Sequence, residues 1–220
     1  MAAHYDPLPF DLGQTLKGTD ADGNLINKEV LGKVFTCPAY STVATGTRQP
    51  RPKRSEQGLT LVALRNVSGI TLYGKRTAAL KSAAGIDGVT SVDGYGGTLG
   101  QDGVVFIDEF LATSGVADKD IFWAVVRGPV IVRSSYVDTN FNGDIAYGSP
   151  IVQATAAATT AASTSGRVSN ITLVANATQA AQAEQNRKMS ANIIARALSS
   201  LTTANTDADL LVNANCRMLW

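Results

Sequence analysis

Short segments rich in apolar and β-forming residues recur along the chain, and polar turn residues separate them. The strongest pattern lies in residues 117–137, where IFWAVV and VIV form nearly continuous apolar runs on either side of Arg127-Gly128-Pro129. Continuous apolar runs bounded by turn residues favour strands of a buried sheet. We therefore predict two strands in this segment, with a bend or a β-bulge at Gly128.

Other segments carry weaker β patterns. Residues 59–74 place β-forming residues on both sides of a central Asn-Val-Ser-Gly turn, which predicts two strands or one long bent strand. A proline interrupts another β-forming segment and indicates an edge or a bulge there. The remaining predicted β segments are 33–45, 104–115 (strand or short helix), the start of 145–163, 167–177, 190–203 and 208–220.

Helix and loop patterns are fewer. Residues 75–85 contain helix formers that end at a glycine, which predicts one or two helical turns, and residues 178–188 could also form a helix. The glycine-rich segment 85–103 predicts a long exposed loop. Its glycines match neither a dinucleotide-binding nor a Walker spacing, so a surface loop is favoured over a phosphate site.

Together these patterns predict a mainly β fold, a compact β-sandwich or β-barrel with long irregular loops and one or two short helices. We expect residues 1–58 to form an extended N-terminal arm with a basic loop, because this part is rich in proline, glycine and turn residues. Residues 59–220 would form the β-rich domain, which could divide near residue 137.

The charge balance points away from nucleic acid and from anionic membranes. The 220 residues carry a net charge of +1, and only 17% are charged, where about a quarter is usual. A surface covered by small and polar residues suits a protein that lies against neighbours. Without an apolar run of about 20 residues we expect no membrane span, and without a signal peptide we expect synthesis and use in a reducing cytoplasm.

Candidate catalytic residues are few. The single histidine, His4, lies in a proline-flanked segment, and Cys37 would be a nucleophile only if His4 folded beside it. Cys37 and Cys216 are better explained as two buried thiols than as a disulfide. The adjacent Asp108 and Glu109 would face opposite sides of a strand, so we interpret them as turn or surface carboxylates. We therefore expect no enzyme and no cofactor.

One segment has the beginning of a calcium-loop pattern. Asp138, Asn140, Asn142 and Asp144 place oxygen-bearing side chains in alternation, with a glycine at the sixth position. Position 12 is Ser149 rather than a bidentate glutamate, which excludes a full EF-hand. The alternative is a hairpin turn, because Asn-Gly is the pair favoured in type I′ turns. We assign no metal and leave the question of calcium open.

A local basic run stands out from this neutral background. Four of the seven residues from 48 to 54 are basic and two are prolines. The prolines exclude a groove-binding helix and favour a stiff extended chain, and no aromatic residues are interleaved for base stacking. Phosphate binding remains an alternative, but docking on an acidic protein surface fits as well. The candidate partner-binding residues are Arg48, Arg51, Lys53 and Arg54.

Three segments of the C-terminal part form a recognisable series: GPVIVRSS (128–135), NGDIAYGSPIVQATAAATTAA (142–162) and the terminal segment 192–220. This series resembles the capsid decoration (cement) proteins of tailed bacteriophages. Members of this group often show a glycine-containing strand, a Gly-Asp segment followed by Gly-x-Pro-Ile/Val, a Thr/Ala-rich stretch and a terminal strand. The matching residues here are Gly143, Asp144, Gly148, Pro150, Ile151, Ile194, Ala195, Ala197 and Leu198.

The resemblance implies a virion structural protein that binds the outside of the assembled head and stabilises the capsid lattice. Its partners would be the lattice of the major capsid protein and neighbouring copies in a homotrimer, with no nucleic acid and no membrane. The protein would be made in the host bacterial cytoplasm and end on the capsid exterior. In that setting the basic run would lie on an acidic patch of the capsid or of a neighbouring copy.

Three alternatives remain open at this point. The same β pattern would serve another virion structural or adhesion module, such as a head-fibre base or a tail component. A small hydrolase or metal-dependent enzyme would need the few candidate residues named above, and a nucleic-acid binder would use residues 48–54.

Overall fold

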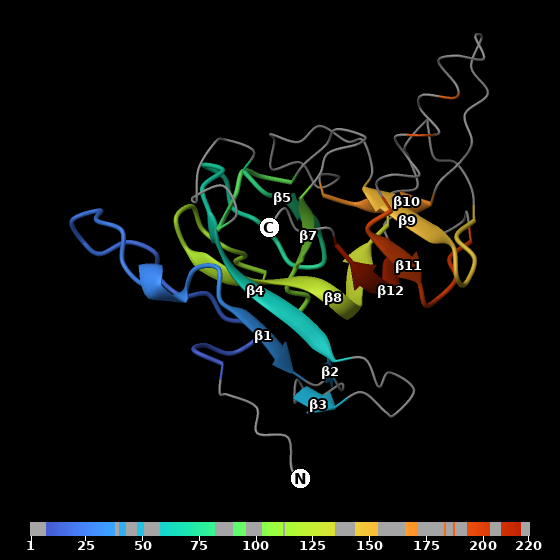
Figure 1. Ribbon diagram of the computed structural model, residues 1–220, viewed down its shortest axis with the longest axis horizontal. Helices are drawn as coiled ribbons and strands as arrows, with labels where there is room; N and C mark the ends of the chain where they lie inside the picture. The colour runs from blue at the N-terminus through green and yellow to red at the C-terminus, as the bar shows by residue number, and fades with distance from the viewer. Residues whose placement is uncertain are drawn as a thin grey trace.

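The computed structural model confirms a mainly β protein (Figure 1). It describes residues 8–37, 40–42, 48–50, 58–81, 90–95, 103–111, 113–134, 144–153, 166–170, 183, 187, 193–202 and 208–216. Within these residues the helical structure is limited to the 3-10 helix η1 (Lys28–Val30) and to the single positions Ala183 and Arg187.

The strands vary in length from two residues to thirteen. Those of the first half are β1 (Val34–Cys37), β2 (Tyr40–Thr42), β3 (Arg48–Pro50), β4 (Leu59–Asn66), β5 (Thr77–Ala79), β6 (Ser91–Val92) and β7 (Val104–Ile107). Those that follow are β8 (Ile121–Arg133), β9 (Pro150–Gln153), β10 (Val168–Asn170), β11 (Ala195–Ala197) and β12 (Asp209–Asn215).

Ten of the described strands form one sheet, and β2 and β3 form a separate two-stranded ribbon. The sheet runs β1-β4-β8-β12-β11-β9-β10, with β7 beside β8, β5 beside β7, and β6 beside β4. All pairs are antiparallel except β4 with β6. The strand β8 lies at the centre and is shared by both halves of the sheet (Figure 1).

Isolated bridges curl each half of the sheet toward a barrel. In the first half, Leu80 after β5 bridges Val92 of β6, which brings the β8-β7-β5 side back to β4. In the second half, Ser134 after β8 bridges Val168 of β10 in parallel, so the far edge of the β12-β11-β9-β10 series returns to the end of β8. A sheet that curls in this way can enclose its apolar side chains even though several of its strands are short.

The segment expected to form two strands is one continuous strand, β8. Opposite β4 it carries a β-bulge, because Thr60 pairs with Arg127 and Leu61 with Val125, which leaves Val126 as an extra residue. Gly128 follows with a φ of 105°, a conformation that glycine adopts without strain. The predicted irregularity is therefore present, but it bends the strand and does not end it.

The buried apolar side chains form two clusters, and the bulge changes which face of β8 packs in the larger one. Before it, the odd-numbered Ile121, Trp123 and Val125 belong to that cluster, and after it the even-numbered Val130 and Val132 do. Side chains alternate along a strand, so one extra residue reverses the order. One apolar cluster can thus continue from the first half of the sheet into the second.

The continuous apolar runs of β4 and β8 are explained by burial on both faces. Phe122 and Ala124 of β8, with Val62 and Leu64 of β4, belong to a second buried cluster inside the first half of the sheet. The opposite faces of the same strands pack in the larger cluster. Each fully buried Leu or Phe side chain stabilises the fold by about 1.5–3 kcal/mol relative to an exposed one.

The N-terminal residues belong to this core and do not form a free arm. Trp123 stacks on Phe10 at a centroid distance of 4.6 Å and meets Phe35 of β1 edge-on at 5.3 Å. Its Nε1 donates a hydrogen bond of 2.8 Å to the carbonyl oxygen of Phe10. Leu12 and Val30 are buried in the same cluster. The expected boundary at residue 58 therefore does not separate residues 8–37 from the β-rich domain.

Two further sequence expectations are corrected. The helix expected at 75–85 is wrong where the structure describes it, since Thr77–Ala79 is β5 with all three residues buried against β7. Tertiary pairing here overrides the helix propensity of alanine. In 59–74 only β4 is a strand, because the buried Asn66 side chain donates to the carbonyl oxygens of Ile70 and Val116 and fixes a turn.

We predict that Gly128→Ala lowers the free energy of unfolding by about 2 kcal/mol or more. An alanine Cβ would lie 2.6 Å from the carbonyl oxygen of Gly58, in addition to the unfavourable φ. Gly69→Ala is the matched control, because Gly69 has a φ of 75° and nothing within 4 Å of the added Cβ. Urea unfolding of both variants measures the difference, and equal losses would contradict the account of the bulge.

Candidate interaction surface

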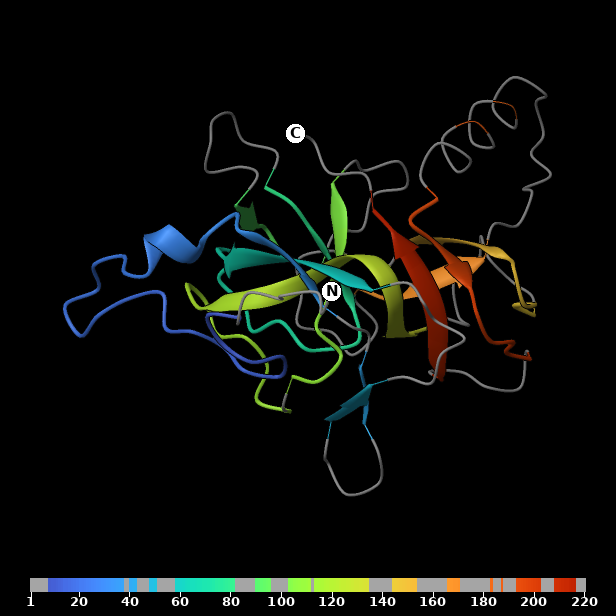
Figure 2. The same ribbon diagram turned by 60° about the horizontal axis from the view of Figure 1, so that its bottom comes forward.

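The candidate site is the two-stranded ribbon of β2 and β3, which projects away from the main sheet (Figure 2). It continues the β1-β4 pair, because β2 follows β1 after two residues and β3 precedes β4 in the chain. The register joins Tyr40 to Pro50 and Thr42 to Arg48. Isolated two-stranded ribbons are at best marginally stable in water.

The structure places the candidate residues only in part. Arg48 begins β3, so the first three positions of the basic run are extended. Arg51, Lys53 and Arg54 lie outside the described residues, and their predicted extended form stays a prediction. Pro50, at the end of β3, has no backbone N–H to offer a further strand. A proline at this position makes the edge of β3 less suited to pairing with a further strand.

Several other charged groups of the surface are engaged within the fold. Asp209 of β12 pairs with Lys75 and, at 3.0 Å, with Nε of Arg133. Lys17 Nζ lies 3.0 Å from the carboxylate of the buried Asp120. These groups hold neighbouring segments together, and partly exposed pairs of this kind contribute about 0.2–1 kcal/mol each.

Asp108 and Glu109 follow the end of β7 and do not lie on a strand, and Asp108 is not a surface carboxylate. It is 1% exposed, and its two oxygens accept hydrogen bonds from the backbone N–H groups of Gly13 and Phe110. Glu109 accepts a hydrogen bond from the N–H of Ile131, which lies beyond the part of β8 that pairs with β4. Both carboxylates thus complete backbone hydrogen bonding, which the alternation of a strand alone cannot predict.

The predicted calcium residues lie mostly outside the described part of the chain. Asp138, Asn140 and Asn142 are not described, and the exposed Asp144 accepts a hydrogen bond of 3.1 Å from Asn170 through its backbone oxygen. Among the residues that the structure does describe, no group of three or more His, Cys, Asp or Glu could hold a metal ion. The choice between a calcium site and a hairpin turn therefore stays a prediction.

Of the two cysteines and the histidine, the structure describes the side chain of Cys216 alone. Cys37 ends β1, but its side chain, like the whole of His4, lies outside the described part. Cys216 packs against both apolar clusters, and burial raises the pKa of its thiol. A thiol held neutral in this way is a poor nucleophile. In the described regions, no helix is long and apolar enough to cross a membrane.

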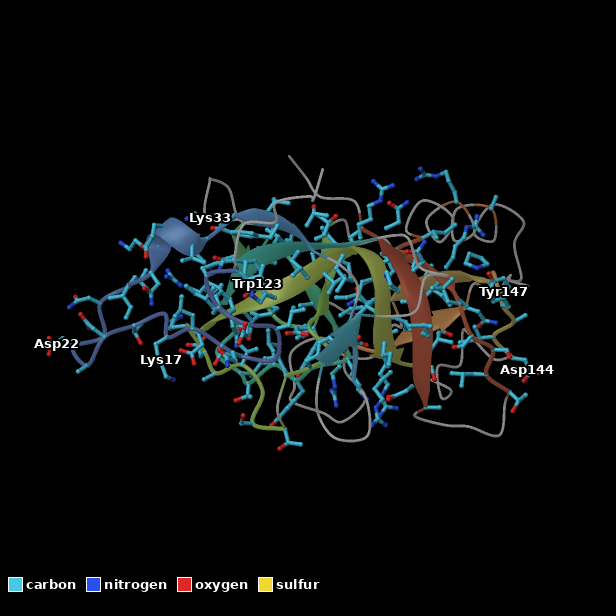
Figure 3. All side chains as sticks on the ribbon, turned by 90° about the horizontal axis from the view of Figure 1, so that it is seen from below. Lys17, Asp22, Lys33, Trp123, Asp144 and Tyr147 are labelled. Atoms are coloured by element: carbon cyan, nitrogen blue, oxygen red, sulfur yellow. The ribbon has the colours of Figure 1, made fainter. Side chains whose placement is uncertain are left out.

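Two exposed apolar residues were missed in the sequence. Leu25 is 45% exposed and Tyr147 is 74% exposed. Both lie in turns, within DADGN-Leu and Ala-Tyr-Gly-Ser-Pro. A large apolar side chain between turn residues is the signal that could have identified them. Figure 3 shows Asp22, three residues before Leu25, and Tyr147 at opposite ends of the long axis.

Comparison with known proteins gives no relative. No family model matches the chain, and neither a curated protein nor a solved structure matches it.

We predict that Asp108→Asn lowers the free energy of unfolding by about 1–3 kcal/mol, because an amide has one acceptor oxygen for two buried N–H groups. Asp93→Asn is the control, since Asp93 is exposed. Thermal and urea unfolding of the two variants give the comparison. A loss for Asp93→Asn as large as that for Asp108→Asn would contradict the role assigned to Asp108.

Proposed function

We propose that the protein is a structural component of a tailed-phage virion that binds the outside of the assembled head and stabilises the capsid lattice. The basic run of residues 48–54, which begins in β3, would contact an acidic patch of the shell. Binding to the assembled lattice and not to its separate subunits stabilises that lattice by mass action. Many copies on one shell provide avidity, so each contact can be weak.

The observation that carries the proposal is the spatial grouping of the segments that resemble decoration proteins. Gly128 lies on β8, Gly148 and Pro150 lead into and begin β9, and residues 195–197 form β11. The terminal strand β12 pairs with both β8 and β11, and β11 pairs with β9. Segments far apart in the sequence are therefore adjacent strands of one half of the sheet, as a shared structural unit requires.

The projecting ribbon adds a second line of support. Pro50, which ends β3, is a kind of residue that keeps a strand edge from pairing with another sheet, and the basic run begins with Arg48 in β3 and continues after it in the sequence. Such a ribbon suits docking on a preformed acidic surface. Position in the particle separates this function from that of a head-fibre base or a tail component.

The direct test is the composition of purified virions. The proposal predicts that the protein is present at high copy number on the head in electron microscopy, and that particles without it lose their contents at lower temperature. Absence from purified particles would end the proposal, and density on the tail or on a fibre would favour the alternative.

Reversal of charge in the basic run after β3 tests the contact itself. We predict that Arg51→Glu with Lys53→Glu lowers occupancy on particles at least tenfold while the purified protein stays folded, because like charges would then face the acidic patch. Lys28→Glu with Lys33→Glu is the matched control, since both lysines are exposed and the net charge changes equally. Equal occupancy of the two double variants would make the basic run a solvated loop.

A further inference from the structure

One strand of the main sheet, β1, has a neighbour on one side only. Elsewhere the described strands close on themselves, because the bridge from Leu80 to Val92 joins the end of β5 to β6, and the bridge from Ser134 to Val168 joins the end of β8 to β10. Strand β1 pairs with β4 and with no other described strand. Its far side is therefore the open edge of the main sheet, on the outside of β4 (Figure 1).

The backbone groups on this edge are unpaired within the described structure. The N–H of Ala63 donates a hydrogen bond of 3.1 Å to the carbonyl oxygen of Lys33. Backbone groups of an antiparallel strand face a given neighbour at alternate residues, so those of Phe35 face β4 and those of Val34 and Thr36 point away from it. Neither Val34 nor Thr36 has a hydrogen bond on that side. Unpaired edge groups of this kind are a template for a further strand.

The side chains of β1 suit strand pairing and do not block it. Val34 and Thr36 are both β-branched and exposed, and they share one face of the strand. On the other face, Phe35 is half-buried against Trp123, so an apolar residue added beside it would extend an existing apolar contact. None of the four residues of β1 is charged or a proline, which are the residues that commonly protect an exposed edge.

Charge in the surrounding segment favours an acidic occupant. Residues 30–55, which contain β1 and both strands of the ribbon, include five basic residues and no acidic one. Just before them, Lys28 and Glu29 are both exposed and offset each other. A strand that carries carboxylates would therefore be attracted to this edge, whereas the same edge of a second copy would bring like charges together.

We propose that the open edge of β1 binds an extended acidic segment of another protein as an added antiparallel strand. The backbone groups of Val34 and Thr36 hold this strand by hydrogen bonds, and one of its apolar residues packs beside Phe35. The basic residues of segment 30–55 attract its carboxylates. This inference goes beyond the proposed function, because it concerns backbone pairing along β1 and needs no capsid.

The first test is binding of a short peptide to the purified full chain. The probe is a fluorescein-labelled peptide that alternates valine and threonine between terminal glutamates, and its twin has lysines in place of the glutamates. Fluorescence polarisation is expected to show saturable binding of the acidic probe and binding at least about tenfold weaker for the lysine twin. No saturable binding of the acidic probe, or equal binding of the two peptides, would overturn the proposal.

Substitution at the edge tests the backbone contact. Thr36→Pro removes an N–H from the open edge and leaves the pairing with β4 intact, so it is expected to weaken binding of the acidic probe at least about tenfold. Thr36→Val is the matched control, because it keeps the N–H and the branched shape, and it should bind as the parent does. Equal binding by the two variants would contradict strand addition. Val34→Pro, with the same expected loss, replaces Thr36→Pro if circular dichroism shows unfolding.

Amide exchange in the parent chain locates the added strand without any substitution. With the acidic probe bound, the amides of Val34 and Thr36 are expected to exchange at least about tenfold more slowly by NMR, because each gains a hydrogen bond. The amide of Phe35 already faces β4 and should keep its rate. Slower exchange at other residues, with Val34 and Thr36 unchanged, would place the probe elsewhere and overturn the proposal.

Sedimentation velocity without the probe tests the other occupant of this edge. Any self-association is expected to be equal in the parent and in Thr36→Pro. Self-association that Thr36→Pro abolishes would make a second copy the occupant and overturn the proposal. Because particles are absent from all of these experiments, failure of peptide binding is distinct from absence of the protein from virions, which would end the proposed function alone.

Discussion

The extra residue in β8 is the constraint on which the rest of the fold depends. A strand shared by two halves of a sheet would normally present alternate residues to the same side throughout. The bulge at Val126 reverses that alternation, so Trp123 before it and Val130 after it face one apolar cluster. Because Gly128 has no side chain, the bent strand can pass close to the backbone of Gly58 just after the bulge. Without this reversal of side-chain alternation, the two halves of the sheet could not share one apolar cluster.

The distribution of exposed features follows from this shared core. The N-terminal residues cover one face of β4 and β8 through the stacking of Phe10 and Phe35 on Trp123, so the β2-β3 ribbon leaves the body at the edge of a fixed sheet. Asp22 and Tyr147 lie at opposite ends of the long axis (Figure 3).

Much of this fold could be predicted from the sequence, and the exceptions have physical causes. The apolar runs of β4 and β8 and the irregularity near Gly128 were visible, because burial on both faces leaves no polar alternation. The helix expected at 75–85 was wrong because pairing with β7 decides the structure of Thr77–Ala79. The roles of Asp108 and Glu109 depend on backbone groups 95 and 22 residues away in the chain, and no local pattern records such partners.

We expect β8 to join both halves of the sheet into one cooperative unit. Hydrogen exchange followed by mass spectrometry in increasing denaturant tests this claim, with peptides from β4 and β7 reporting on the first half and peptides from β9 and β12 on the second. The account predicts that the slowest amides in all four strands converge on the same free energy of opening. Opening of one half at a clearly lower free energy, with the other half still protected, would contradict it.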